Sequence, residues 1–129
     1  MNTKNIVNGI VYKDIISLDG WEFLDYMEKH PQLYSDGKFL NYISKNYLFE
    51  LEFWIDVIRE IDDLNILKQI DENILTNGFI IKWMCLNLND LNWRFKNNTI
   101  SEFNVKRAKR HIKNIKQYLS YVKINSKNV

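Results

Sequence analysis

Hydrophobic residues recur at steps of three and four over most of this 129-residue chain, which is the spacing of one face of an α-helix. The most regular pattern lies near the C-terminus and comprises Val105, Ala108, Ile112, Ile115, Leu119 and Val122. Thr99 and Glu102 precede it at the spacing of a capping box, in which each side chain accepts a hydrogen bond from a free backbone N–H group. We therefore predict a long C-terminal helix that this capping box begins.

Similar patterns predict several helices upstream. The first follows Asp19 and ends at His30-Pro31, because the residue before a proline avoids the helical region. Ser35-Asp36 can cap the second. The third, within residues 47–62, has apolar residues on more than one side, so we expect it at the centre of the fold. The helix predicted over residues 79–96 has five apolar residues on one side, namely Ile80, Met84, Leu88, Leu91 and Phe95.

The remaining segments decide the fold class. Residues 64–77 continue a helical pattern, and Asn77-Gly78 predicts its end because glycine accepts the left-handed conformation. Residues 9–16 have the composition of a strand, but the sequence offers no second strand to pair with it. We therefore predict an all-α fold, a single compact bundle of five to seven helices over residues 1–129. Residues 1–14 are expected to be irregular and residues 125–129 to fray.

The composition indicates a folded domain without a membrane span or a disulfide. Hydrophobic residues make up 46% of the chain and aromatic residues 14%, enough for a substantial core. No apolar run approaches the ~18–20 residues that cross a bilayer, and the N-terminal residues lack the pattern of a secretory signal. Cys85 is the single cysteine, which excludes an internal disulfide and a multi-cysteine metal site. We expect a cytoplasmic protein without a cofactor.

Charge divides the chain into two unlike parts. Residues 1–100 hold 10 Lys/Arg and 15 Asp/Glu, whereas residues 101–129 hold 8 Lys/Arg and one carboxylate, Glu102. The formal net charge of +2 therefore hides a strongly basic C-terminal helix. The sign of a local field guides the choice of partner more than the net charge does.

The basic residues of the last helix are the first candidate site: Lys106, Arg107, Lys109, Arg110, Lys113 and Lys116. Three interpretations stay open, namely a solvated or internally paired surface, a protein-binding face, and a face that neutralises nucleic-acid phosphates. Base readout usually relies on a recognised motif, and the sequence has neither helix-turn-helix spacing nor a zinc finger. The pattern therefore indicates charge without naming the partner.

Carboxylates on the predicted central helix are the second candidate site: Glu52, Asp56, Glu60 and Asp63. Steps of four, four and three place them on one side of a helix, where like charges repel unless cations neutralise them. Either the basic C-terminal helix lies alongside, or a cationic partner binds there. No His, Lys or glycine loop accompanies them at fixed spacing, so we assign no catalytic and no metal-binding residue.

Isolated residues with reactive or aromatic side chains are given structural roles. His30 lies at a helix end, and His111 lies among cations, which disfavours a metal-ligand role for it. Cys85 is expected to be a small buried hydrophobic residue rather than a nucleophile. Core positions are also expected for Trp83, Trp93 and Phe95, and the alternative is a partial groove in which an exposed aromatic residue would anchor an interface.

One family resemblance is carried by Trp21, Phe39, the run Leu51 to Trp54, Ala108, Ile112 and Ile115. The spacing of these residues resembles that of regulator-of-G-protein-signalling domains. The resemblance covers the whole chain and implies an all-helical domain that contacts a Gα subunit. The chain departs from the family's pattern at Glu50, where the family has Asn, and at Leu48 and Phe49, where it has acidic residues. The Gα-contacting positions are therefore not assigned.

Together these patterns favour a small non-catalytic protein that binds one protein partner through charged helical faces. Inhibitors, immunity proteins and other phage or bacterial accessory proteins work in this way. Nucleic-acid binding through the basic helix is the first alternative. A divergent regulator-of-G-protein-signalling-like domain is the second.

Overall fold

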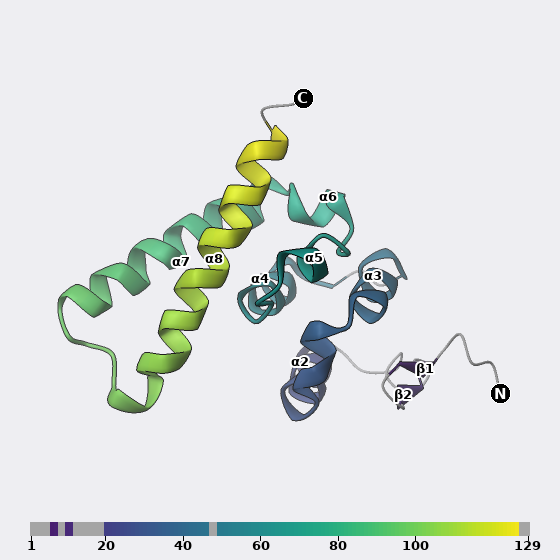
Figure 1. Ribbon diagram of the computed structural model, residues 1–129, viewed down its shortest axis with the longest axis horizontal. Coiled ribbons are helices and arrows are strands. Elements are labelled where there is room, and N and C mark those ends of the chain that lie inside the picture. Colours follow the sequence, from purple (N-terminus) through teal and green to yellow (C-terminus); the bar gives the residue numbers. More distant parts are fainter. Residues whose placement is uncertain (1–5, 8–9, 12–19, 47–48, 127–129) are drawn as a thin grey trace.

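The computed structural model describes residues 6–7, 10–11, 20–46 and 49–126. Within these ranges the fold is compact and contains seven α-helices, which confirms the all-α prediction (Figure 1). The helices are α2 (Gly20–Lys29), α3 (Gly37–Asn46), α4 (Leu51–Arg59), α5 (Leu64–Leu67), α6 (Glu72–Leu75), α7 (Gly78–Lys96) and α8 (Val105–Ser126). Two short 3-10 helices, η2 (Pro31–Ser35) and η3 (Glu102–Asn104), precede α3 and α8.

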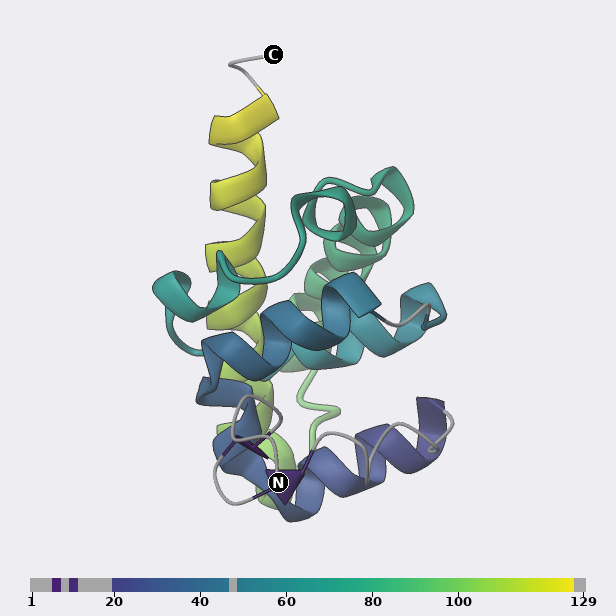
Figure 2. The ribbon, with the colours of Figure 1, turned by 90° about the vertical axis from the view of Figure 1, so that its right-hand side faces the viewer.

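The two longest helices, α7 and α8, form an antiparallel hairpin at one side of the molecule (Figure 1). Helix α4 packs against both of them, and α2 packs against α4 from the other side. Figure 2 shows the hairpin behind the shorter helices, with α3 and α4 crossing in front of it. The hairpin therefore has an inner side, covered by α4, and an outer side.

Helix α4 lies at the centre of the core, as its two-sided apolar pattern predicts. Phe53, Trp54, Val57 and Ile58 are all at most 3% exposed. Phe53 also stacks on Phe49 at a centroid distance of 4.1 Å, which extends the core beyond the start of the helix. Burying four large apolar side chains of one helix contributes about 1.5–3 kcal/mol each, so α4 holds the surrounding helices together.

Two helix ends differ from the sequence prediction. Asn77 does not end a helix but begins α7, because its Oδ1 accepts hydrogen bonds from the backbone N–H groups of Phe79 (2.9 Å) and Ile80 (3.3 Å). The predicted capping box is also wrong. Helix α8 starts at Val105 after η3, and the Thr99 hydroxyl donates to the Arg94 carbonyl instead.

The strand prediction is wrong in one respect. Strand β2 (Ile10–Val11) does have a partner, the two-residue strand β1 (Ile6–Val7), with which it pairs antiparallel. The rest of the segment 9–16 lies outside the described residues. At the other end of the chain α8 is helical through Ser126, beyond the point at which we expected fraying to begin, and 127–129 lie outside the described residues.

Polar side chains on the inner side of α8 fasten the helix to its neighbours. His111, Asn114 and Tyr118 are at most 7% exposed. The Tyr118 hydroxyl donates to the Leu75 carbonyl at the end of α6 (2.5 Å). These residues interleave with the predicted apolar stripe, of which Ala108, Ile115 and Val122 are buried. The apolar pattern thus locates the inner face of α8, and the polar residues fix its position along the fold.

Candidate functional site

The four carboxylates of the predicted acidic face do not share one helix, because α4 ends at Arg59. Glu52 is exposed in the first turn of α4. Asp56 pairs with Arg59 of the same helix (2.6 Å). Asp63 caps α5 by accepting a hydrogen bond from the backbone N–H of Asn65. The expectation that all four lie on one side of one helix is therefore wrong.

Glu60, the first residue after α4, is bound by three cationic or imidazole groups of α8. Its Oε1 accepts hydrogen bonds from Nη2 of Arg107 (3.3 Å) and from Nε2 of His111 (2.7 Å). Its Oε2 pairs with Nη2 of Arg110. Only 12% of the Glu60 side chain is exposed. The basic helix thus neutralises one carboxylate of the central region, which is the intramolecular alternative that the sequence left open.

The environment of Glu60 keeps its carboxylate ionised. Burial by itself would raise the pKa, but the hydrogen bond and charge of His111 and the charges of Arg110 and Arg107 outweigh it and lower the pKa to about 2. A carboxyl group with so low a pKa is a weak proton acceptor at neutral pH and holds no proton to donate. The group therefore suits a structural ion-pair cluster better than general acid–base catalysis.

Two amides of α8 continue this attachment toward the start of α5. Asn114 Nδ2 donates to the Arg59 carbonyl (2.7 Å) and to Asp62 Oδ1 (2.9 Å). Gln117 Nε2 donates to the Ile61 carbonyl (3.3 Å). The carbonyl groups at the end of α4 are thereby satisfied by side chains from a helix more than fifty residues further along the chain.

The other four of the six predicted basic residues form a lysine stripe on α8, which we define as Lys106, Lys109, Lys113 and Lys116. Steps of three, four and three keep them on one face of the helix along about 15 Å. All four are exposed, and none lies within ion-pair distance of a carboxylate in the described part of the chain. The structure therefore separates the six predicted basic residues into two arginines that bind Glu60 and four lysines that face solvent.

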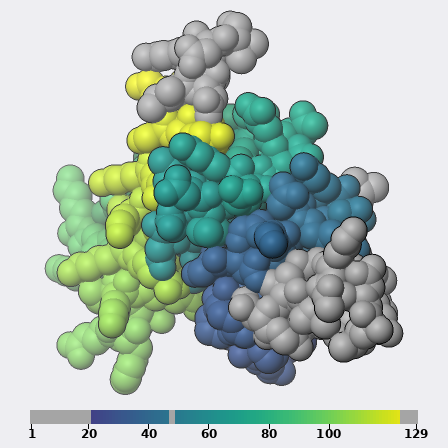
Figure 3. All heavy atoms as spheres, turned by 45° about the vertical axis from the view of Figure 1, so that its right-hand side comes forward, coloured from purple at the N-terminus to yellow at the C-terminus, as the bar shows by residue number. Residues whose placement is uncertain are grey.

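An aromatic residue that the sequence analysis missed lies beside this stripe. Phe103, in η3, is 97% exposed, more than any other large hydrophobic residue described. It lines an open hollow of about 630 Å³ together with cationic residues of α8 only, namely Lys106, Arg107, Lys109, Arg110 and Lys113. Figure 3 shows this part of the hairpin, in light green, extending separate side chains from the molecule. The hollow combines positive charge with one apolar wall.

A second hollow, of about 330 Å³, lies on the other side of the two arginines. Its lining mixes both signs of charge: Glu28, Pro31, Tyr34, Ser35, Glu60, Asp62, Arg107 and Arg110. Burial, followed by the charges of Glu60 and Glu28, raises the pKa of Tyr34 to about 12, so its phenol stays protonated at neutral pH. Since the arginines already pair with Glu60, this hollow offers little unsatisfied charge to a ligand.

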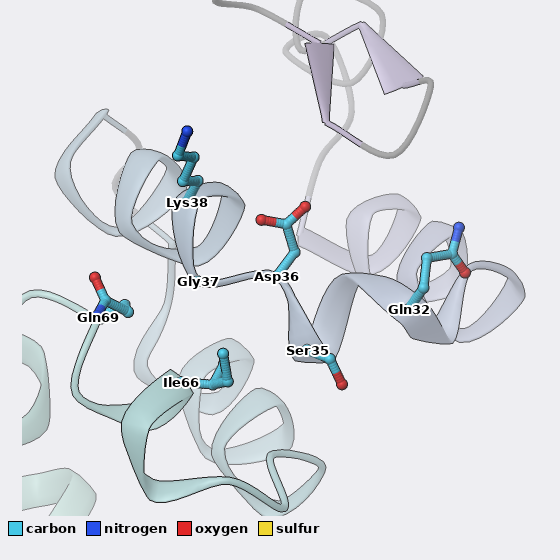
Figure 4. Close-up of a pocket in the computed structure, with 7 residues that line it drawn as sticks. All are labelled: Gln32, Ser35, Asp36, Gly37, Lys38, Ile66 and Gln69. Carbon is cyan, nitrogen blue, oxygen red and sulfur yellow. The ribbon is translucent and has the colours of Figure 1, made fainter.

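The third hollow, of about 600 Å³, separates η2 and the start of α3 from α5 (Figure 4). Asp36 and Lys38 lie on one side of it, and Ile66 and Gln69 lie on the other. The Asp36 carboxylate accepts a hydrogen bond from the backbone N–H of Phe39 (3.1 Å), which caps α3. The lining includes neither a histidine nor a cysteine, the side chains that most often form a nucleophile–base pair.

Several residues expected in the core are instead exposed on α7. Trp83 is 55% exposed, Trp93 is 59% exposed, and Cys85 is exposed as well, so these three predictions are wrong. Phe95 is half-buried. Phe79 and Leu86 on α7, which the sequence did not single out, are exposed as well, and so is Trp21 on α2. Phe79, Trp83, Leu86 and Trp93 follow one another at steps of four, three and seven. The sequence therefore did contain a signal for a second apolar stripe on α7.

The described residues include no group of three or more His, Cys, Asp or Glu side chains that could hold a metal ion. No described helix is both long enough and apolar enough to cross a membrane. The sequence matches no protein-family model, no curated protein and no solved structure, so the resemblance to regulator-of-G-protein-signalling domains gains no support from these comparisons.

Proposed function

We propose that this protein is a non-catalytic binding module that docks one acidic protein partner through the lysine stripe and Phe103. The observation that carries the proposal is the open hollow at the start of α8. Its lining consists of cations and one almost fully exposed aromatic side chain. Aromatic residues that insert into a partner's pocket are typical anchors of protein interfaces, and surrounding charges add specificity.

The position of the cations on α8 supports a binding role. Lys106 and Arg107 lie in the first turn of the helix, and no acidic residue lies there. The N-terminal end of a helix carries a partial positive charge, so each cation at this end costs about 0.3–1 kcal/mol instead of stabilising the helix. Glu60 compensates Arg107, but Lys106 has no such ion pair in the described part of the chain. A role in binding accounts for a lysine at a position where it does not help the fold.

The chemistry of the surface defines the partner's side of the interface. Four lysines in a row fit an acidic segment, and Phe103 requires an apolar side chain or pocket beside that segment. A module that covers such a surface would block it for other ligands, which is how inhibitors and immunity or antagonist proteins act. The predicted acidic residues play no part in this proposal. Glu60, Asp56 and Asp63 have partners within the fold, and the exposed Glu52 has the wrong sign of charge for an acidic partner.

The test compares charge reversal on two helices. Lys106→Glu with Lys109→Glu changes the stripe, and Lys38→Glu with Lys45→Glu makes the same charge change on exposed positions of α3. Each tagged protein captures partners from lysate of the host, with and without nuclease treatment. We expect the wild type and the α3 variant to retain a protein that resists nuclease, and the stripe variant to lose it. Equal capture by both variants would contradict a role for the stripe.

Phe103→Ala tests the apolar part of the same surface. Because the side chain is 97% exposed, its removal should leave the thermal midpoint of unfolding unchanged. Binding to the captured partner should weaken by about tenfold or more if Phe103 is an anchor residue. Unchanged affinity in a titration of the purified partner would restrict the interface to the lysines.

A second candidate function is the binding of single-stranded nucleic acid, which the pairing of exposed lysines with an exposed aromatic ring favours. Lysines can neutralise phosphates, and an aromatic ring can stack on a base. In fluorescence-anisotropy titrations with labelled oligonucleotides, the stripe variant would then show a salt slope smaller by about 1 for each lysine changed. Absence of binding at low salt would exclude this candidate.

A further inference from the structure

Helix α7 exposes an apolar face on the outer side of the hairpin, which Asp90 interrupts between Leu86 and Trp93. We define the α7 stripe as Phe79, Trp83, Leu86 and Trp93, whose exposed fractions are 63%, 55%, 49% and 59%. Residues at steps of four, three and seven lie on one side of a helix. The opposite side of α7, with Ile80 and Met84, is buried in the core. The α7 stripe is therefore additional to the face that the fold already uses.

The area of this face is large for an isolated surface. Three aromatic side chains and one leucine, each roughly half exposed, present roughly 450 Å² of apolar area. The largest apolar patch of a typical monomer is about 300–600 Å² and is often functional. This apolar area is about half of the ~800 Å² per partner of a stable interface, so a weak to moderate association is expected.

The arrangement of the side chains on α7 is complementary to itself. Leu86 lies at the middle, with Phe79 seven residues before it and Trp93 seven residues after it. Lys82 and Asp90 lie four residues before and after Leu86, and both are exposed. When two identical helices pack antiparallel about a two-fold axis through one residue, positions equally far before and after that residue come level with each other. Phe79 of each copy would then lie level with Trp93 of the other copy. Each Lys82 would lie level with the Asp90 of the second copy.

We infer that a second copy of this chain covers the α7 stripe, in an antiparallel homodimer whose two-fold axis passes near Leu86. Asp90 already pairs with Arg94 of its own helix (2.9 Å), but both side chains are about half exposed, and such surface pairs contribute little. The long stem of Lys82 can therefore reach Asp90 of the other copy while Arg94 stays nearby. The inference concerns α7 and does not depend on the function proposed for α8.

Sedimentation equilibrium of the full chain tests the dimer from about 1 to several hundred µM, the range expected for an interface below standard size. We expect reversible dimerisation for the wild type. Leu86→Lys puts two cations at the axis and should leave the protein monomeric, with an unchanged circular-dichroism spectrum since Leu86 is half exposed. A wild type that is monomeric at every concentration would overturn the inference.

Charge exchange tests the antiparallel register. Lys82→Glu and Asp90→Lys should each weaken the homodimer by about tenfold, because either change sets like charges opposite each other twice. Mixing the two variants pairs opposite charges at both places, so a heterodimer should form about as tightly as the wild-type dimer. Homodimers that are unaffected, or a mixture no tighter than the separate variants, would overturn the register and with it the two-fold arrangement.

Cys85 provides a probe of which face is covered. It is the single cysteine of the chain, it is exposed, and it precedes Leu86, so it lies about 100° around α7 from that residue. In the antiparallel dimer the two Cys85 residues lie at nearly the same level of helices that pack about 8–10 Å apart, so the dipolar coupling between spin labels on them should be measurable. Distant labels in a proven dimer would show that another surface associates. Lys106→Glu with Lys109→Glu, the stripe variant of α8, serves as the control and should dimerise like the wild type.

Discussion

Among single residues, Glu60 is predicted to stabilise the fold in a way that depends on pH. Its pKa of about 2 is below the ordinary value of 4.5, so folding favours the ionised form. This contribution is present in full above about pH 4.5 and is lost as the pH falls toward 2. We expect Glu60→Gln to lower the free energy of unfolding by about 2–3 kcal/mol at pH 7, and by much less at pH 2.5.

Urea denaturation at several pH values measures this difference. Glu52→Gln is the matched control, because Glu52 is exposed and makes no ion pair in the described part of the chain. Its effect should stay within about 0.5 kcal/mol at every pH. A difference between the wild type and Glu60→Gln that does not shrink in acid would mean that the cluster does not lower the pKa of Glu60.

Tyr118 is the second residue with a separable effect. Its side chain is 0% exposed, burial raises the pKa of its phenol, and its hydroxyl donates to the Leu75 carbonyl. Tyr118→Phe keeps the ring but leaves that carbonyl without its donor, which should cost about 1–2 kcal/mol in thermal or urea unfolding. Tyr121→Phe on the same helix is the control. Since Tyr121 is only half-buried, the variant should unfold close to the wild type.

At the level of elements, Asn114 decides how α8 sits against the end of α4. It is 1% exposed and donates to two acceptors, the Arg59 carbonyl and the Asp62 carboxylate. Asn114→Ala should cost about 1–3 kcal/mol. Asn114→Asp should cost more, because a buried carboxylate would face two acceptors and gain no donor.

The pH dependence of these two variants separates the causes. Asn114→Asp should recover part of its stability as the pH falls toward 4, because a protonated carboxyl can donate one hydrogen bond again. The stability of Asn114→Ala relative to the wild type should not recover as the pH falls. Ser120→Asp, at an exposed position of α8, is the control for added charge on the helix. Equal curves for all three would contradict a special role for Asn114.

Helix positions were predictable from the sequence where one apolar face dominates, as on α8. On α7 two apolar stripes compete, and periodicity does not say which one is inward, so Trp83 and Trp93 were placed in the core incorrectly. Asn77 was ambiguous for another reason: asparagine favours both ends of helices. The partners of Glu60 lie about fifty residues away in the chain, and no local pattern reports a contact at that separation.

At the level of the whole molecule, the hairpin carries both surfaces to which binding is assigned. The lysine stripe lies on α8 and the α7 stripe on the adjoining antiparallel helix. If the α7 stripe is covered by a second copy, each assembly carries two lysine stripes. Avidity then follows, because a second contact with an array of partners occurs at a high effective concentration. The amount of this protein that is retained on such an array would rise more steeply than the concentration of the protein itself.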